Sequence, residues 1–359
     1  MLRAGTALAD YILPIRTDSV DGADELAEYV RELSTVVRVV VVDGSPRHIH
    51  ACLDRLLEGT AEHVRPDSRF RCRNGKVAGV LTGLALATHD KVVIADDDVR
   101  WDVTALGRVA ALLDSYDVVR PQNCFAAPMP WHARWDSARS LVNRALRSAD
   151  FPGTLGVRRE FLADGYDGDV LFENLELIRT VKARGGRESI PLDLYVRRRP
   201  PTTAHFRDQR IRQAYDSFAE PGRLAVELSL VPLAVAARRR VALLACLAVA
   251  IAEVGRRRAG GRAVFPASTS LWAPAWVAER AVCSWLAVLA RLRGGARYGG
   301  GASRSRRTRS VRLCEPSQNG LIADRPHRHR ATVCRPGSIS VPSTSSSRTS
   351  PRTISGPSG

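Results

Sequence analysis

Short apolar runs rich in valine and isoleucine alternate with longer amphipathic stretches over the first hundred residues. The apolar runs occupy residues 11–15, 36–42 and 92–95, and each ends in polar or turn-forming residues, as buried parallel strands do. The amphipathic stretches, with apolar residues at helical spacing, occupy residues 23–33, 49–57 and 76–87. Because strands and helices alternate, this part of the chain predicts an α/β fold with a βαβαβ nucleotide-binding half.

The middle of the chain, from about residue 118 to residue 196, continues the same domain. Its clearest helical stretch, at residues 173–184, stops at Gly185 and Gly186, which occupy the position where glycine commonly ends a helix. We expect this region to complete the α/β domain and to form its second binding surface.

Beyond Pro221 the chain becomes strongly apolar, at residues 224–237, 241–252 and 271–292. The first two stretches are shorter than the roughly 20 residues needed to cross a bilayer. Glu279 and Arg280 interrupt the third. We therefore expect an interfacial or re-entrant arrangement at a membrane, with a helical subdomain packed on the α/β domain as the alternative.

From Gly294 onward the chain consists mainly of Gly, Ser, Arg, Thr and Pro, which predicts a disordered tail. The expected organisation is an α/β domain at residues 1–220, an apolar, membrane-associated helical region at residues 221–293 and the tail at residues 294–359.

The formal net charge of +17 does not by itself indicate a nucleic-acid surface. Residues 300–359 carry eleven arginines against Glu315 and Asp324, so this tail holds much of the excess. We expect no nucleic-acid partner. The seven cysteines are widely scattered without a CxxC pair, and no signal-peptide-like apolar run precedes Asp10, which together predict a cytoplasmic domain with reduced thiols.

Three consecutive carboxylates, Asp96, Asp97 and Asp98, follow directly on the apolar run at residues 92–95. Open α/β sheets bind ligands at the carboxyl ends of their strands. Clustered carboxylates repel one another unless a cation is bound, so Mg²⁺ or Mn²⁺ bridging these groups to a diphosphate is expected. Alternatively, the run only caps a following helix near residues 103–113.

Four segments in chain order resemble the successive motifs of family 2 glycosyltransferases with the GT-A fold. They are YILPIR at 11–16, VVVVDGS at 39–45, Gly75-Lys76 leading to GLALA at 83–87, and VVIADDD at 92–98. The resemblance implies a GT-A nucleotide-diphospho-sugar transferase fold with a Rossmann-like central sheet. It also implies a nucleoside-diphosphate sugar as donor, with a UDP-sugar favoured.

The resemblance assigns roles to individual residues in these motifs. Pro14 and Arg16 would lie at the nucleotide pocket, Asp43 would contact the base, and Lys76 would lie near the base or the phosphates. The run Asp96, Asp97 and Asp98 would supply the DxD motif, in which Asp96 and Asp98 handle ribose and metal. For Asp43 the alternative is an ordinary turn residue.

A later segment, residues 153–177, resembles the family stretch in which a glycine-rich segment precedes a Glu-Asp motif. In an inverting transfer the Asp of that motif removes the proton of the acceptor hydroxyl. Here Asn174 holds that position, and an amide cannot accept the proton. We therefore expect Glu173 to be the base, with Asp169 and Glu176 as further candidates; a first-turn acid that only favours the helix is the alternative for Glu173.

Residues 205–213 resemble the Gln-x-x-Arg-Trp motif of membrane-associated family members such as cellulose, chitin and ceramide-glucosyl enzymes. Gln209 and Arg212 match, whereas Gln213 stands where tryptophan is expected. Arg212 would hold the diphosphate and His205 would complete the metal shell beside Asp96 and Asp98. The alternatives are a solvated arginine and a structural histidine.

The resemblance implies an inverting glycosyltransferase that acts on a hydroxyl acceptor. Together with the apolar C-terminal region, it predicts a lipid or cell-envelope glycan as the acceptor class and a location at the cytoplasmic face of a membrane. A nucleotidyltransferase-like enzyme could use the same carboxylates, but residues 9–20 lack the glycine-rich phosphate loop typical of such enzymes. A catalytically inactive, membrane-associated sugar-nucleotide-binding protein is favoured by Asn174 and Gln213.

Overall fold

The computed structural model describes residues 7–70, 72, 74–150, 153–170 and 172–293, together with the backbone of residues 297–298 and 301–302. Apart from those four residues, the predicted tail at 294–359 lies outside the described residues. The four form a short antiparallel pair, β11 (Arg297–Tyr298) and β12 (Gly301–Ala302).

A mixed sheet lies at the centre of the α/β part, with the strand order β3-β2-β1-β4-β8-β6-β9. Its strands are β1 (Asp10–Ile15), β2 (Arg38–Asp43), β3 (Glu62–Val64), β4 (Lys91–Ala95), β6 (Val118–Val119), β8 (Thr154–Arg158) and β9 (Glu188–Ser189). β1 pairs in parallel with β2 and β4, whereas β8 runs antiparallel to β4 and β6. The predicted α/β class and the parallel βαβαβ half are confirmed.

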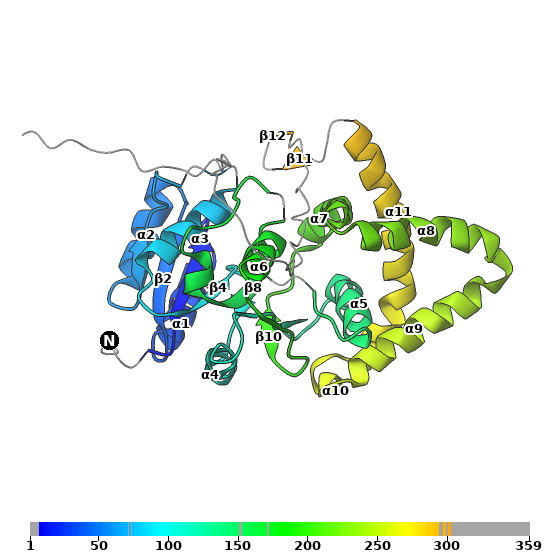
Figure 1. Cartoon of the computed structure of the whole chain (residues 1–359), viewed down its shortest axis with the longest axis horizontal. Helices are drawn as coiled ribbons and strands as arrows, with labels where there is room; N and C mark the ends of the chain where they lie inside the picture. The colour runs from blue at the N-terminus through cyan, green and yellow to red at the C-terminus, as the bar shows by residue number, and fades with distance from the viewer. Residues whose placement is uncertain are drawn as a thin grey trace, which may run out of the picture. The chain divides into compact units, whose positions relative to one another are not determined.

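Helices cover both faces of this sheet (Figure 1). One face is covered by α1 (Ala23–Leu33), α2 (Arg47–Leu57) and α4 (Val103–Leu112), and the other by α3 (Gly75–Leu86) and α6 (Glu173–Ala183). β1 is buried along its whole length, which explains why it is apolar without alternation. The strand predicted at 36–42 begins only at Arg38, because Val36 and Val37 donate to Leu33 in the turn that ends α1.

Two glycines on α3 allow that helix to lie directly on β1. A Cβ atom at Gly83 would come within 2.4 Å of Ile12, and one at Gly79 within 2.9 Å of Pro14. Such distances are shorter than any real carbon contact, so only glycine permits this packing. The close approach brings the first turn of α3, with Lys76, to the carboxyl end of β1.

A smaller sheet and a helical region follow the α/β part. The small sheet has the order β5-β10-β7, with β5 (Val99–Arg100), β7 (Gln122–Phe125) and β10 (Tyr195–Arg198). The helices are α5 (Trp131–Ala145), α7 (Thr203–Asp216), α8 (Pro221–Ala236), α9 (Val241–Arg257), α10 (Gly261–Val264) and α11 (Ala273–Leu292). Short 3₁₀ turns are η1 (Arg159–Leu162), η2 (Ser217–Ala219), η3 (Arg238–Arg240) and η4 (Ala267–Trp272).

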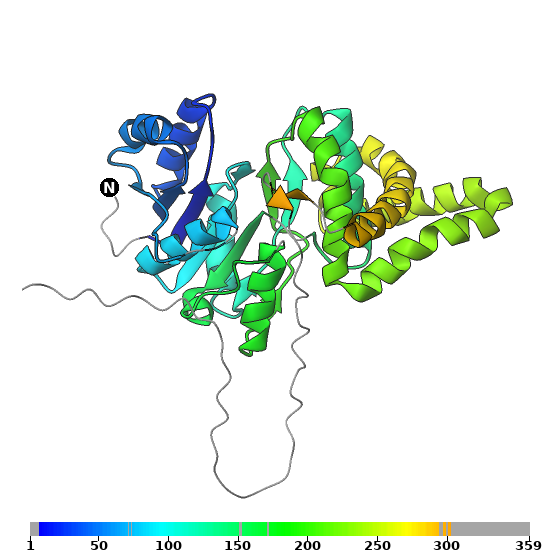
Figure 2. The same ribbon diagram turned by 90° about the horizontal axis from the view of Figure 1, so that it is seen from above.

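The helices beyond residue 220 pack on one another and on earlier helices. α9 contacts α5, and α11 contacts α5, α7, α8 and α9. α8 and α9 run out to η3 and back, diverging from η3 toward α11 (Figures 1 and 2). Within the described residues, no helix combines the length and the apolar character that crossing a membrane requires.

Arg144 joins α5 to the segments around it. Its side chain is fully buried, and its guanidinium donates at 2.6–3.3 Å to five oxygens. These acceptors are the carbonyls of Leu192, Gly255 and Arg258, the amide oxygen of Gln122 and the hydroxyl of Tyr195. A single side chain therefore ties α5 to α9, to the small sheet and to the loop before β10.

Replacing Arg144 by alanine is expected to lower the free energy of unfolding by about 3 kcal/mol, because several buried oxygens lose their donor together. Denaturant unfolding followed by circular dichroism measures this. Arg262→Ala, on the exposed side of α10, is the matched control and should leave the midpoint nearly unchanged. Equal midpoints for the two variants would show that the network contributes no net stability.

Candidate active site

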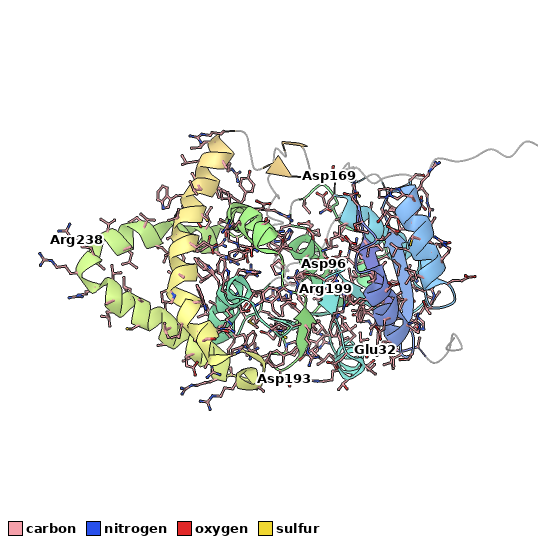
Figure 3. The ribbon with its side chains drawn as sticks, turned by 180° about the vertical axis from the view of Figure 1, so that it is seen from behind. Glu32, Asp96, Asp169, Asp193, Arg199 and Arg238 are labelled. Carbon is pink, nitrogen blue, oxygen red and sulfur yellow. The ribbon has the colours of Figure 1, made fainter. Side chains whose placement is uncertain are left out.

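A cavity of about 1100 Å³ opens where β1, β2 and β4 end. Its acidic lining residues are Asp96, Asp97, Asp98, Asp136 and Glu173, and its cationic ones are Arg16, Lys76, Arg139, Arg198, Arg199, Arg210 and Arg212. Figure 3 shows Asp96 and Arg199 near each other in the middle of the molecule. The excess of cationic side chains among the described lining residues suits an anionic ligand.

Lys76 joins two of the acidic side chains. Its Nζ lies 2.5 Å from Asp96 Oδ1 and 2.8 Å from Glu173 Oε1. Asn74 caps α3 by accepting from the backbone N–H of Lys76 at 3.1 Å, which fixes this first turn. Burial opposes the charge of Lys76, but the two carboxylates outweigh it and raise its pKa, so the amine stays protonated. Burial likewise favours a neutral Glu173, yet Lys76 outweighs it and lowers the pKa of that carboxyl.

Asp98 is held by the small sheet. β10 pairs with β5 and brings the Arg198 guanidinium to Asp98 Oδ2 at 2.6 Å and 3.0 Å, and Arg199 N donates to the Asp98 carbonyl at 2.8 Å. Asp98 Oδ1 is buried and has no hydrogen-bond partner among the described residues. This residue lines the cavity, and one oxygen of its carboxylate has no hydrogen-bond partner among the described residues.

The alternative that the aspartate run caps the next helix is not realised. Asp102, and not the run, caps α4 by accepting from Ala105 N at 2.7 Å. Asp97 is exposed, and its backbone carbonyl accepts from Arg100 at 2.6 Å. All three carboxylates of the run line the cavity, as predicted for a ligand-binding strand end.

Helix α7 places His205, Gln209 and Arg212 on the same cavity. Thr202 caps this helix by accepting from His205 N at 3.2 Å. The side chain of His205 contacts Gln209, one turn further along the helix, and its Nε2 lies 2.7 Å from Gln209 Nε2. Gln213, which replaces the tryptophan of the motif, also lines the cavity.

The predicted metal ligands Asp96, Asp98 and His205 face one cavity but do not form a ligand set in this structure. A possible metal-ligand set needs at least three His, Cys, Asp or Glu side chains whose ligand atoms lie close together. Among the described residues, Asp43, His50 and His63 form such a group, with ligand atoms within 4.8 Å of one another. Lys76, Arg198 and Gln209 engage the three predicted ligands instead. The unpartnered Asp98 Oδ1 fits a divalent ion that takes one protein ligand there.

Of the remaining residues predicted to bind the nucleotide sugar, two are among the described residues that line the cavity and one is not. Pro14 and Arg16 line the cavity. Asp43 is fully buried, and its carboxylate accepts from Ser45 N at 2.7 Å and lies 3.2 Å from His63 Nε2. Its chain neighbours Val42 and Gly44 line the cavity, but among the described lining residues Asp43 is absent. Its predicted contact with the base stays a prediction.

Of the three candidate bases, only Glu173 is among the described residues that line the cavity. Asp169 is exposed (Figure 3), and its backbone N–H donates to Asp167 at 2.8 Å. Glu176 lies one turn beyond Glu173 on α6, where burial raises the pKa of its carboxyl.

Sequence reasoning missed Arg198 and Asp216. Asp216 ends α7 and lines a second cavity of about 160 Å³, which shares Asp96, Glu173 and Arg212 with the first. Burial raises the pKa of Asp216 to about 7, and its Oδ1 has no hydrogen-bond partner among the described residues. Neither residue belongs to a motif; the run of arginines at 197–199 is the one local signal.

Residues 24–162 match the model of glycosyl transferase family 2. The matched segment extends from α1 to η1 and includes Lys76 and the aspartate run. Over this segment the chain is similar to family 2 glycosyltransferases. The predicted enzyme class, a glycosyltransferase, is confirmed. No curated protein sequence matches the chain.

Two of the solved structures to which this chain is similar have the following identity, coverage and TM-score. One is the mannosyltransferase PcManGT from Pyrobaculum calidifontis in complex with GDP-Man and Mn²⁺, with 19% identity over 77% of this chain and 86% of that chain and a TM-score of 0.45. The other is glucosyl-3-phosphoglycerate synthase from Mycobacterium tuberculosis in complex with Mn²⁺, UDP and phosphoglyceric acid. It has 18% identity over 57% of this chain and 75% of that chain, with a TM-score of 0.40.

Proposed function

We propose that this chain is an inverting glycosyltransferase that moves a sugar from a nucleoside-diphosphate sugar to a hydroxyl acceptor. The observation that carries the proposal is the cavity at the ends of β1, β2 and β4, in which Lys76, Arg198 and Arg212 surround the aspartate run. Lysine and arginine bind phosphate oxygens through charge-assisted hydrogen bonds. A cavity of about 1100 Å³ is also large enough for a nucleotide sugar. The sequence resemblance favours uridine as the base.

Asp98 is the proposed protein ligand of a Mg²⁺ or Mn²⁺ ion through Oδ1, which has no hydrogen-bond partner among the described residues. When bound, such an ion supplies Lewis-acid stabilisation of the departing diphosphate. The protein's own contribution is electrostatic. Lys76 and Arg212 would neutralise the growing charge on the leaving group, and Arg198 holds the Asp98 carboxylate in place at 2.6 Å.

Glu173 is the proposed base. In the transfer, the acceptor hydroxyl gives its proton to Glu173 while its oxygen bonds to the anomeric carbon. The bond from that carbon to the diphosphate oxygen breaks, the leaving group takes the electron pair, and the configuration inverts. A bound diphosphate would attract Lys76, which now lies 2.8 Å from Glu173 Oε1, and would thereby release this oxygen for the acceptor.

The second cavity is the proposed acceptor side. It adjoins the donor cavity at Glu173 and is also lined by Asn174, Asp216 and Arg223. A lipid or a cell-envelope glycan is the acceptor class that we propose, in keeping with the membrane association argued below.

The function is tested by incubating the full chain with UDP- and GDP-sugars, Mn²⁺ or Mg²⁺ and a membrane extract, and measuring nucleoside diphosphate release. Metal-dependent release from one donor supports the proposal and identifies that donor. Tight donor binding without any turnover would instead support an inactive sugar-nucleotide-binding protein. Asn174→Asp, which restores the family's carboxylate, would then be the first variant to examine.

We also propose that the α8–α9 hairpin lies on the cytoplasmic face of an anionic membrane. Two observations support this. Exposed apolar side chains run along both helices, and they are Val226, Val231, Leu233, Val235, Val241, Leu243, Leu247, Ile251 and Val254. The three exposed arginines of η3 lie at the far end of the hairpin, where Figure 3 shows Arg238. Apolar and basic groups together favour an interface with anionic lipid.

Leu243→Glu combined with Leu247→Glu is expected to weaken binding to vesicles rich in anionic lipid by more than about tenfold. The two side chains lie one turn apart on α9, and each inserted leucine contributes about 1.5–3 kcal/mol. Co-sedimentation with vesicles measures the change. Val20→Glu, at another exposed apolar position, should bind like the unmodified chain. Undiminished binding of the leucine variant would exclude this hairpin as the docking surface.

A further inference from the structure

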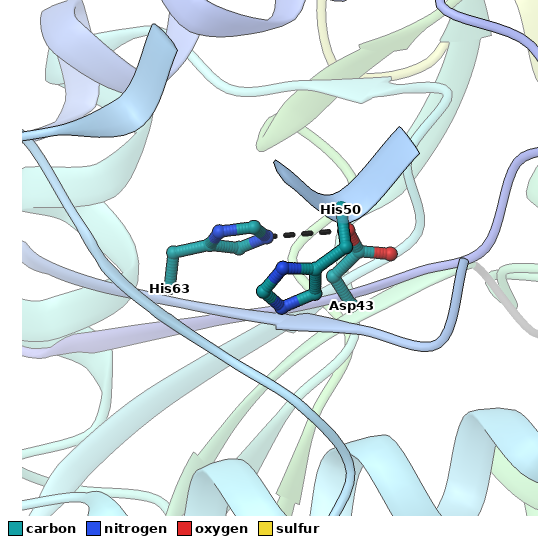
Figure 4. A group of neighbouring side chains, drawn as sticks. All are labelled: Asp43, His50 and His63. Carbon is teal, nitrogen blue, oxygen red and sulfur yellow. Dashed lines mark hydrogen bonds and ion pairs between the residues drawn. The ribbon is translucent and has the colours of Figure 1, made fainter. Parts of the chain in front are cut away.

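Two histidines and an aspartate converge beside the donor cavity (Figure 4). Asp43 ends β2, His50 lies on α2 and His63 lies on β3, so three consecutive elements contribute one side chain each. His63 Nε2 lies 3.2 Å from Asp43 Oδ2, and the ligand atoms of all three residues lie within 4.8 Å of one another. The function proposed above uses neither histidine.

His63 is oriented as metal-bound histidines are. Its Nδ1 lies 2.9 Å from the Asp54 carboxylate, so its Nε2 is directed at Asp43. A histidine that binds a metal through one ring nitrogen almost always uses the other to donate to a carboxylate, a carbonyl or water. The His63 side chain is only 3% exposed, which holds the ring in this orientation.

His50 contributes the third side chain of the cluster. Its Nε2 is buried and has no hydrogen-bond partner among the described residues. Its ring is stacked on that of His63, with centroids 4.2 Å apart and planes at 25°. A buried polar atom without a partner costs about 1–3 kcal/mol, and binding a metal ion would offset that cost.

We propose that Asp43, His50 and His63 bind a divalent transition-metal ion, with Zn²⁺ as the fitting ion. Two imidazoles and one carboxylate are ligands that Zn²⁺ accepts at about 2.0–2.2 Å, leaving a fourth position for water. Ligand atoms around such an ion lie about 3.4 Å apart, which the Asp43–His63 pair already matches at 3.2 Å. Because the His50 ring is stacked on that of His63, a rotation of His50 out of the stack would be needed to complete the set.

The ion would fix the wall of the donor cavity. Val42 and Gly44, on either side of Asp43, line that cavity, and so does Pro66, two residues beyond β3. Metal binding would join β2, α2 and β3 at this wall. The site is separate from the aspartate run. It uses the Asp43 carboxylate, so it takes the place of the base contact that the sequence resemblance implies for this residue.

Zinc binding to the tag-free full chain tests the proposal. After treatment with a chelator, the protein is titrated with Zn²⁺ against a chromogenic chelator, and Co²⁺ is added separately to record its absorption spectrum. We expect one ion at this site, visible Co²⁺ bands typical of low coordination number, and a higher melting temperature with Zn²⁺.

His50→Ala should weaken Zn²⁺ binding at least 100-fold, and Asp54→Asn about 10–100-fold, because the latter removes only the group that orients His63. His48→Ala, an exposed histidine on the same helix, is the matched control and should bind like the unmodified chain. Asp98→Ala should also retain the affinity. Equal affinity for His50→Ala and His48→Ala, loss of affinity only with Asp98→Ala, or an absence of Co²⁺ bands in the unmodified chain would each overturn the proposal.

Discussion

Replacing Asp98 by alanine is expected to reduce sugar transfer by about 10²–10³-fold and to abolish its dependence on Mg²⁺ or Mn²⁺. Asp98 Oδ1 is the atom proposed to hold the ion, and alanine removes it. The same change leaves Arg198 without its carboxylate, which shifts a guanidinium beside the diphosphate. Initial rates of nucleoside diphosphate release at a series of metal concentrations measure both effects.

Two comparisons make this result specific. Asp98→Asn keeps an oxygen for Arg198 but loses the negative charge. It should therefore hold Arg198 in place better than Asp98→Ala does, without restoring the dependence of the rate on the metal ion. Asp114→Ala removes an exposed carboxylate that pairs with Lys91 at the opposite end of β4, and it should leave the rate nearly unchanged. Metal-dependent turnover in Asp98→Ala at more than half the normal rate would exclude Asp98 as the metal ligand.

Replacing Glu173 by glutamine is expected to lower kcat by about 10²–10⁴-fold with little change in donor affinity. Glutamine keeps the size of the side chain and an oxygen for Lys76, but it cannot accept the acceptor's proton. Steady-state kinetics together with a separate donor-binding titration distinguish the two quantities. Glu176→Gln and Asp169→Asn are the comparison variants, since neither side chain is among the described residues lining either cavity.

The pH profile separates Glu173 from Asp216 as the base. A base acts in its deprotonated form. The lowered pKa of Glu173 keeps it deprotonated across the neutral range, so with Glu173 as base kcat/KM should not change between about pH 6 and pH 8. Burial raises the pKa of Asp216 to about 7, so with Asp216 as base the rate should fall about tenfold for each pH unit below that value.

The turnover of two variants, Glu173→Gln and Asp216→Asn, also shows which of the two carboxylates is the base. Full turnover in Glu173→Gln together with loss of turnover in Asp216→Asn would transfer the role to Asp216, which lines the acceptor cavity beside Asn174. In that case the carboxylate missing at Asn174 is replaced from the end of α7 rather than from the preceding residue of α6.

The sequence by itself determined the elements whose pattern is local. The helix predicted at 23–33 is α1, and the apolar runs predicted at 11–15 and 92–95 are β1 and β4 within one residue at one end. Each has a continuous pattern of apolar positions that specifies its type without help from distant parts of the chain. The position of Asp96, Asp97 and Asp98 at a strand end followed from the same local pattern.

Only the tertiary structure decided which side chains those elements bring together. Arg198 reaches Asp98 from 100 residues away, and Lys76 reaches Glu173 from 97 residues away. The two-residue strands β6 and β9, and the antiparallel β8, likewise depend on neighbours in the sheet. The periodicity of a sequence cannot predict such contacts. The free energy of each contact arises from packing and charge between segments that are far apart in the sequence. The His50 and His63 pair beside Asp43 has the same origin, since it exists only once β2, α2 and β3 have packed together.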